Sequence, residues 1–429
     1  MHCYCLAYEK VREWCIFVSM QTESQSNELM STRTRDGYVW TRVLDTPFWG
    51  LFNLLPFILY KDLFATPFQL ALLITLKPLV SIFSSYWAAR VYAKPSRLLP
   101  SIILARWIAY LPFLLLPIFH NAWYLIFCFG LFMFLQVGMM PAWMELLKQN
   151  VPNKTREKVF SYAQAFGYLG GGLLPFALGW VLDEWKGAWH WMFPLAALVA
   201  LTSQFWQRKI LVNPASFKPT NHNEVHPLWQ PWRNAWEVLR QRSDFTKFQI
   251  GFMLIGSGLM IIQPSLPIFF VDRLHLSYTE LGVAITLCKG VGFACGSPLW
   301  VRWMQQVNLF HFGALIALLA ALFPFLLLAA QVQMGWLYIA FLMYGFMQSG
   351  NELSWNMSGP TFARQEDSAP YSSVNIIAVG LRGALIPSIG ALCLEQFGLN
   401  FVIVLSSILC LLASFRMAIY SKKNVLQNV

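Results

Sequence analysis

Lys77 and Lys289 are charged residues in places where a charge is costly. Lys77 lies about eleven residues into an apolar stretch, which is about 16 Å along a helix axis. A charged side chain at the centre of a membrane helix costs about 2.5–3.5 kcal/mol. Each lysine must therefore face a wet cavity or a partner. Two ammonium groups together could hold a carboxylate or a phosphate ester. The alternative is that each lysine is structural and bonds to helix carbonyls or to a carboxylate.

The two lysines are related by an internal repeat. Shifting the sequence by 212 residues aligns several polar and special residues at once: Lys77 with Lys289, Ser85 with Ser297, Arg90 with Arg302, Gln136 with Gln348, Trp143 with Trp355 and Pro175 with Pro387. Upstream, the offset is 211 and aligns Pro56 with Pro267, so one extra residue lies near Cys288. Composition alone would not align these residue types. The repeat predicts two halves with matching elements.

Glu352 and Arg382 are the next residues that could do chemistry. Each lies inside a later apolar stretch, and the two could form an ion pair within the second half. Protonation of Glu352 would release Arg382, so the pair could be a gate or a proton-linked switch, or else a fixed clamp. Asn351 and Glu352 align with Met139 and Met140, so the repeat is broken at these positions. We therefore expect Asn351 to contribute to substrate binding and Glu352 and Arg382 to coupling or gating.

Neutral polar residues complete the candidate binding set. Gln136 and Gln348 lie at equal depth in repeat-related stretches, where their amides could bond to substrate or to neighbouring helices. Asn53 and Gln263 are weaker candidates for the same cavity. Arg106 is close enough to the end of its stretch to reach water, so we expect it to snorkel to the membrane surface.

These residues are carried by segments long and apolar enough to cross a bilayer. Hydrophobic residues make up 57% of the 429 residues and charged residues 12%, about half the charged share of soluble chains. Most segments have the length of about 20 residues that a membrane helix needs. Twelve segments are predicted, at 46–60, 66–89, 98–119, 122–144, 159–182, 188–206, 248–270, 278–301, 309–330, 335–357, 374–396 and 399–420.

The net charge of +11 follows the same topology. Only Lys61, Lys186 and Arg273 fall in the connections on one side, whereas the other side is rich in lysine and arginine. The positive-inside rule therefore predicts a multi-pass protein of the cell membrane with both termini in the cytoplasm. The basic excess is explained without nucleic acid, and we expect none as a partner. A lipid bilayer and a small solute are the expected partners, and the chain is expected to be monomeric.

The predicted organisation has five parts. Residues 1–45 form a cytoplasmic tail, of which 1–19 could be a misassigned start, and residues 46–206 form a six-helix bundle. Residues 207–247 form a cytoplasmic linker, residues 248–420 a second bundle, and residues 421–429 a short tail. Trp232, Trp236 and Leu239 have helical spacing next to arginines, which indicates an amphipathic helix on the membrane surface or a helix packed under the bundle.

The chain resembles the major facilitator superfamily. Twelve spans as six plus six, a cytoplasmic linker and a parallel repeat are similar to that family over about residues 46–420. The loop signature after the second span survives as Arg90, Lys94 and Arg97, but its glycine and aspartate are missing. The stretch from Val151-Pro152 to Pro175 resembles the family's antiporter motif in degenerate form. The resemblance implies an all-α fold whose repeat-related second and eighth spans line a central cavity.

The expected function is secondary active transport of a small anionic solute by alternating access. The eroded signatures also allow a lipid or lysolipid flippase, or a receptor derived from a transporter. An enzyme within the membrane is not expected, because the seven histidines form no metal-ligand or catalytic cluster. No metal or cofactor is implied, and no phosphate-binding loop is present. Proton and sodium coupling both stay open, as do the substrate and the choice between symport, antiport and uniport.

Overall fold

The computed structural model describes residues 2–92, 98–152, 174–211, 230–363 and 369–427. Every regular element within these residues is helical. The first half contains α1 (His2–Lys61), α2 (Pro67–Tyr92), α3 (Leu98–Tyr110), the 3₁₀ turn η2 (Leu111–Leu115), α4 (Ala122–Asn150), α6 (Trp189–Thr202) and α7 (Gln204–Gln207). The predicted segment 159–182 lies largely outside the described residues.

The second half repeats this arrangement after the linker helix α8 (Gln230–Gln241). Its first three spans are interrupted or long helices: α9 (Ser243–Ile261), α10 (Ser265–Ile268), the π-helical turn η4 (Phe269–Arg273), α11 (Tyr278–Gly282), the π-helical turn η5 (Val283–Cys288), α12 (Lys289–Met304) and α13 (Leu309–Ala329). Three further helices complete it: α14 (Gly335–Ala363), α15 (Ala369–Phe397) and α16 (Leu399–Gln427).

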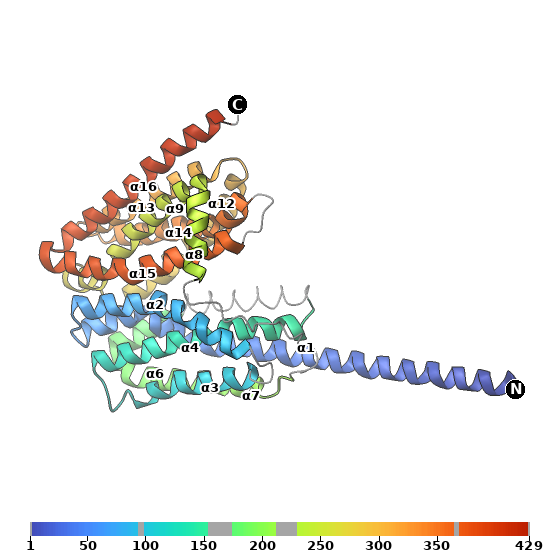
Figure 1. Ribbon diagram of the computed structural model, residues 1–429. Helices are drawn as coiled ribbons and strands as arrows, with labels where there is room; N and C mark the ends of the chain where they lie inside the picture. The colour runs from blue at the N-terminus through green and yellow to red at the C-terminus, as the bar shows by residue number, and fades with distance from the viewer. Residues whose placement is uncertain (1, 93–97, 153–173, 212–229, 364–368, 428–429) are drawn as a thin grey trace.

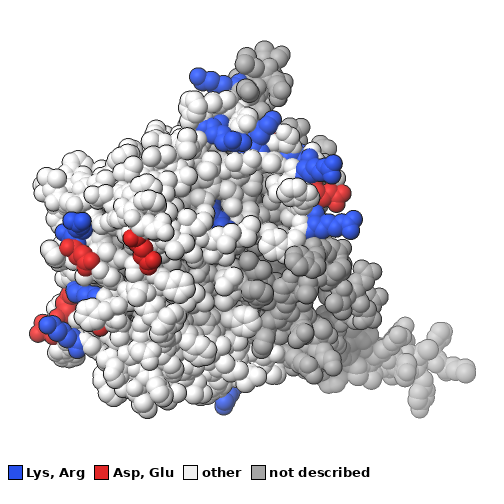
Figure 2. Space-filling model, turned by 60° about the vertical axis from the view of Figure 1, so that its left-hand side comes forward, with Lys and Arg blue, Asp and Glu red and all other residues white. Residues whose placement is uncertain are grey.

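The two halves form two groups of helices, and α15 of the second lies along α2 of the first (Figure 1). The N-terminal end of α1 and the end of α7 lie at the right of this view, and the C-terminal end of α16 lies at its top. We call the end of the first half at which α7 lies the linker side, and the other end of its helices the opposite side. In the described part of the chain, eight helices are long and apolar enough to cross a membrane. Figure 2 shows a broad surface of uncharged side chains, with most of the charged ones at its margins.

Backbone geometry preserves the repeat beyond what the sequence shows. Phe64 and His275, which are 211 residues apart, both adopt a positive φ of 50° in the turn that precedes α2 or α11. Gly187 and Gly398 are also 211 residues apart and have φ angles of 79° and 81°. Non-glycine residues rarely adopt positive φ, so coincidence at equivalent turns is strong evidence for duplication.

The helices that follow these turns begin with the same capping box. The Gln69 backbone N–H donates to Thr66 Oγ1 (3.3 Å), while the Thr66 N–H donates to Gln69 Oε1 (2.8 Å). In the second half, Glu280 and Ser277 make the same reciprocal bonds at 3.1 and 2.8 Å. A capping box satisfies two backbone donors and so fixes where a helix begins. Both repeat-related helices therefore start at equivalent residues.

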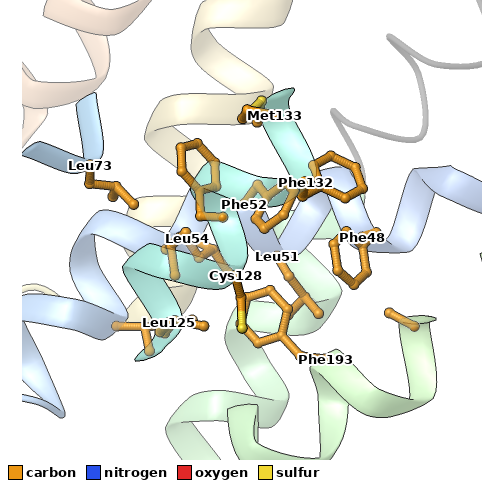
Figure 3. Close-up of a cluster of buried hydrophobic side chains, with 14 of the residues drawn as sticks. Phe48, Leu51, Phe52, Leu54, Leu73, Leu125, Cys128, Phe132, Met133 and Phe193 are labelled. Atoms are coloured by element: carbon orange, nitrogen blue, oxygen red, sulfur yellow. The ribbon is translucent and has the colours of Figure 1, made fainter. Parts of the chain in front are cut away.

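The first half is held together by an aromatic core (Figure 3). Phe48 of α1 lies 5.2 Å from Phe132 of α4 and 5.7 Å from Phe193 of α6, measured between ring centroids. Phe52, one helical turn after Phe48, lies 4.9 Å from Phe132. Edge-to-face aromatic pairs add about 0.5–1.5 kcal/mol beyond the burial of their area. The core therefore packs α1, α4 and α6 against one another.

The first bundle begins before residue 46, contrary to the predicted boundary. α1 is continuous from His2, and Tyr38, Thr41 and Asp45 are all buried. The continuous apolar stretch of the sequence begins only at residue 46, because these three residues are polar or lie next to charged residues. Packing in the bundle extends at least two helical turns further toward the linker side.

The linker contains the predicted helix, and Trp232 of this helix is less exposed than Trp236. Ala235, Val238 and Leu239 of α8 pack on the core of the second half, whereas Trp236 is 71% exposed. Arg242, directly after α8, donates to the Phe362 carbonyl and the Tyr371 hydroxyl, both at 2.7 Å. The helix is thus packed under the second bundle and also presents an aromatic side chain outward.

Candidate functional site

Lys77 and Lys289 approach each other across the interface between the halves. Lys77 belongs to α2 and Lys289 is the first residue of α12. The charge of Lys77 acts on the Lys289 ammonium, and so does the charge of Glu352. Lys77 is exposed, while Lys289 is partly buried with its ammonium 5.2 Å from the centre of the Tyr344 ring. Two cations from different halves therefore lie within electrostatic reach of one another.

The turn η5 accounts for the extra residue that the repeat places near Cys288. It runs from Val283 to Cys288 and ends directly before Lys289. A π-helical turn accommodates one additional residue within an α-helix and often occurs at functional sites. The additional residue rotates α12 about its axis relative to the helix before it. It therefore determines the direction in which Lys289 points.

A cavity of about 200 Å³ lies in the second half. Its walls bring together five of the residues predicted from the sequence: Gln263, Gln348, Asn351, Glu352 and Arg382. Gln348 donates from Nε2 to Glu352 Oε1 over 3.4 Å, and Tyr344, which contacts Lys289, also lines the cavity. Residues from α9, α14 and α15 thus form one polar pocket near the paired lysines.

Arg382 does not pair with Glu352 in this structure, although both line the cavity. Its Nη1 instead donates to the Phe252 carbonyl over 3.1 Å, and the side chain is 7% exposed. A Cβ added to Gly256 would lie 1.8 Å from Arg382 Nη1, so the guanidinium fills the space that a side chain at Gly256 would need. The charge that acts on Glu352 is that of Lys289. The Glu352–Arg382 ion pair expected from the sequence is therefore not among the contacts of the described residues.

The first half has its own buried ion pair, centred on Asp45. Arg106 donates from Nη2 to Asp45 Oδ1 (2.6 Å) and from Nη1 to Oδ2 (3.0 Å). The Tyr110 hydroxyl donates to Oδ1 (2.7 Å), and Gln136 Nε2 to Oδ2 (3.5 Å). Arg106 is 3% exposed, so the prediction that it snorkels to the surface is wrong. Asp45 holds it inside the bundle.

Hydrogen bonds close the interface between the halves on the opposite side. Asp183 of the first half accepts from the backbone N–H groups of Tyr278 and Thr279, both at 2.8 Å, and from the Thr279 hydroxyl at 2.7 Å. The Tyr60 hydroxyl donates to Asp272 Oδ2. A Cβ on Gly179 would lie 2.6 Å from the Tyr278 carbonyl, so the backbones are in direct contact.

Lys61 adds a further contact to this closed end. Its ammonium donates to the Leu276 carbonyl over 3.3 Å and lies 4.5 Å from the centre of the Tyr278 ring. Asp62, the next residue, is partly buried beside Tyr278, and burial raises the pKa of its carboxyl above the ordinary value. Access to the paired lysines from the opposite side is therefore obstructed.

Comparison with known proteins identifies the fold. The family model described as Major Facilitator Superfamily matches residues 43–387. The chain belongs to the Major Facilitator Superfamily. It is accordingly a multi-pass secondary transporter and not an enzyme. No curated protein matches the sequence significantly.

Solved structures of other superfamily members share this fold at low identity. A POT family transporter in complex with thioalcohol conjugated peptide is 13% identical, with a TM-score of 0.69, over 91% of this chain and 96% of that chain. The nucleoside transporter NupG is 10% identical, with a TM-score of 0.68, over 90% and 98%. A POT family transporter in complex with 5-aminolevulinic acid is 13% identical, with a TM-score of 0.67, over 91% and 96%. At these identities the likeness establishes the architecture alone.

In this superfamily transporter the predicted residues fall into two groups. The first group contains Lys77, Lys289 and the five cavity residues, which lie in the second half and at its interface with the first. Gln136 instead belongs to the Asp45 cluster, and Asn53 is exposed on α1 and has a partner of its own. The loop signature around Arg90, Lys94 and Arg97 lies outside the side chains that the structure describes.

Sequence reasoning missed Asp45 and Asp183. Asp45 was assigned to the tail because it precedes the first apolar window, although its position in a continuous helix indicates burial. Asp183 lies at the end of the fifth span next to Glu184 and Lys186, where charges normally face water. Only the position of α11, a segment about 95 residues away in the sequence, reveals its role.

Proposed function

We propose that this superfamily member transports a small anionic solute that binds between Lys77 and Lys289. The observation that carries the proposal is that two lysines, one from each half, lie within electrostatic range of each other inside apolar helices. Two like charges repel, and each is costly away from bulk water. A bound anion would offset both costs. Because the lysines belong to different halves, the anion would also join the halves in a central position.

The polar cavity beside Lys289 supports the rest of the binding site. Gln263, Gln348 and Asn351 supply amides that bond either to acceptors or to donors on a solute. The cavity volume of about 200 Å³ is smaller than the range of about 300–1,000 Å³ typical of drug-sized ligands. We therefore assign the substrate to small organic anions, with the anionic group at the lysines and the remainder among these amides.

Alternating access is supported by the contacts that close one end of the interface between the halves. The hydrogen bonds of Asp183, Tyr60 and Lys61 hold the halves together on the opposite side. Under the positive-inside rule the linker side is cytoplasmic, so this conformation is closed toward the exterior. Release of these contacts would open the interface toward the exterior and expose the lysines to it.

The test is solute uptake by purified protein in liposomes. A panel of small mono- and dicarboxylates and phosphate esters is first screened by thermal stabilisation, because a ligand that binds the folded state raises its unfolding temperature. Uptake of the best ligand is then compared for wild type, Lys77→Gln, Lys289→Gln and Lys186→Gln. Lys186 is exposed on the opposite side and is the matched control.

We expect both central variants to lose uptake while they unfold at the wild-type temperature or above, and Lys186→Gln to transport normally. Normal uptake of anions by Lys77→Gln and Lys289→Gln would remove the lysines from the mechanism. Stabilisation by neutral or cationic solutes only would remove the anionic class itself.

A further inference from the structure

A groove on the outside of the first half shares no described lining residue with the cavity of the proposed transport site. It has a volume of about 570 Å³ and is formed where α3 meets the end of α6 and α7 on the linker side. Its described lining residues are Trp107, Leu201, Thr202, Gln204, Phe205, Arg208 and Lys209. None of the candidate transport residues is among them. The groove therefore needs an explanation of its own.

The linker-side end of the groove is positively charged. Arg208 and Lys209 are adjacent, both are exposed, and no aspartate or glutamate is among the described lining residues. The Lys209 ammonium lies 3.8 Å from the centre of the Phe205 ring. A cation–π contact at this distance orients the ammonium while leaving its other faces available. Two cations thus occupy one end of the groove without a counter-charge in its described wall.

The deeper wall of the groove is apolar and faces away from the bundle. Trp107 is 39% exposed and Phe205 is 61% exposed, and Leu201, which belongs to the core of the first half, also lines the groove. On a membrane protein these outward aromatic surfaces contact lipid. The groove thus combines a basic end with an outward-facing apolar wall.

The groove also has a fixed floor. Arg106, directly before Trp107, donates from Nη2 to the Ala200 carbonyl over 2.9 Å, which ties α3 to α6. Gln204 Nε2 donates to the Ile103 carbonyl over 3.5 Å, which extends the same seam toward the linker side. On the flank of α7, Trp206 stacks on Trp40 of α1 at 5.0 Å between ring centroids. The groove is therefore built on a rigid seam between three helices.

We infer that this groove binds one anionic phospholipid of the cytoplasmic leaflet. The phosphate lies between Arg208 and Lys209, and the glycerol and upper acyl chains lie against Trp107 and Phe205. Basic pockets between membrane helices on the cytoplasmic side have the chemistry that anionic headgroups require. A soluble phosphate compound would use the two cations but not the aromatic wall. The bound lipid would strengthen the seam between α3, α6 and α7.

The experiment measures thermal unfolding of the purified full chain in detergent with added lipid. Phosphatidylglycerol and phosphatidylcholine with identical acyl chains are compared at equal concentrations, with glycerol 3-phosphate as the soluble probe. Titration gives an apparent affinity for each. The proteins are wild type, Arg208→Gln/Lys209→Gln, and the control Arg302→Gln, whose arginine is exposed at the end of α12 in the other half.

We expect phosphatidylglycerol to stabilise wild type and Arg302→Gln at lower concentrations than phosphatidylcholine. The double variant should bind phosphatidylglycerol about 25-fold more weakly, since each basic residue near an anionic surface contributes about fivefold. Both replaced side chains are exposed, so the lipid-free unfolding temperature should match wild type. Single variants should each show about fivefold weaker binding.

Three results would overturn the inference. Equal stabilisation of wild type by the two lipids would exclude recognition of the anionic headgroup. Unchanged phosphatidylglycerol affinity in the double variant would exclude Arg208 and Lys209. Stabilisation by glycerol 3-phosphate at the same concentrations as phosphatidylglycerol would assign the groove to a soluble phosphate compound and not to a lipid.

Discussion

Replacing Asp183 should release the closed end of the transporter. The capping box of α11 satisfies the backbone N–H groups of Ser277 and Glu280. The N–H groups of Tyr278 and Thr279 have no partner within the helix, and the Asp183 carboxylate of the other half accepts from both. Its negative charge also lies at the positive end of the helix dipole. When the halves separate, these bonds are lost.

The magnitude follows from the same contacts. Removing the side chain that caps a helix costs about 0.5–2 kcal/mol, and exposed hydrogen bonds fall near the middle of that range. A loss of about 1 kcal/mol from the closed conformation raises the ratio of open to closed molecules about fivefold. Asp183→Asn keeps one acceptor oxygen but loses the charge, so we expect an increase of about twofold.

The assay is the distance between spin labels on the opposite side, at Lys186 and Arg273, in a background without the native cysteines. Both labelled residues are exposed and belong to different halves. The longer-distance population should increase in the order wild type, Asp183→Asn, Asp183→Ala. Glu184→Ala is the control, because Glu184 is the adjacent exposed carboxylate. If Asp183→Ala and Glu184→Ala give the same distance distribution as wild type, the carboxylate does not hold the halves together.

Three further changes test the buried and partly buried charges. If protons drive transport, Glu352→Gln should still exchange substrate across liposomes but no longer accumulate it; unchanged accumulation would remove Glu352 from coupling. Asp45→Asn leaves the Arg106 charge unpaired, so we expect a loss of about 3–5 kcal/mol of stability, seen as a lower unfolding temperature, whereas an unchanged temperature would contradict the ion pair. Burial raises the pKa of the Asp62 carboxyl in the folded protein above its value in the unfolded chain. Its ionisation therefore lowers the free energy of unfolding as pH rises above the unfolded-state pKa. Asp62→Asn should therefore raise the unfolding temperature at pH 8 and not near pH 4, and an equal effect at both would refute this.

The fold could be predicted because membrane helices leave a strong signal in composition. Apolar stretches of about 20 residues, basic loops on one side and the 212-residue repeat all follow from local rules. The capping boxes at Thr66 and Ser277 were also readable as Thr or Ser followed three residues later by Gln or Glu. These features depend on neighbours in the sequence.

The site was only partly predictable because side-chain partners depend on how helices face each other. The predicted depth in the membrane identifies Lys77 and Lys289 as candidate site residues. It does not predict where the Arg382 side chain points, and its guanidinium occupies the space beside Gly256. Asp45 was missed because an apolar window cannot recognise a charge neutralised by Arg106. Asp183 was missed because its partners belong to the other half.

The π-helical turn before Lys289 contains one residue more than a regular α-helix would have there. Each residue of an α-helix turns the chain by about 100° and advances it by about 1.5 Å. Deleting Ile285 would allow the turn to close into a regular α-helix. Lys289 would then point to a different face and lose its position opposite Lys77, although no charged residue had been changed. The register of one helix, and not only the presence of two lysines, therefore determines whether the halves share an anion.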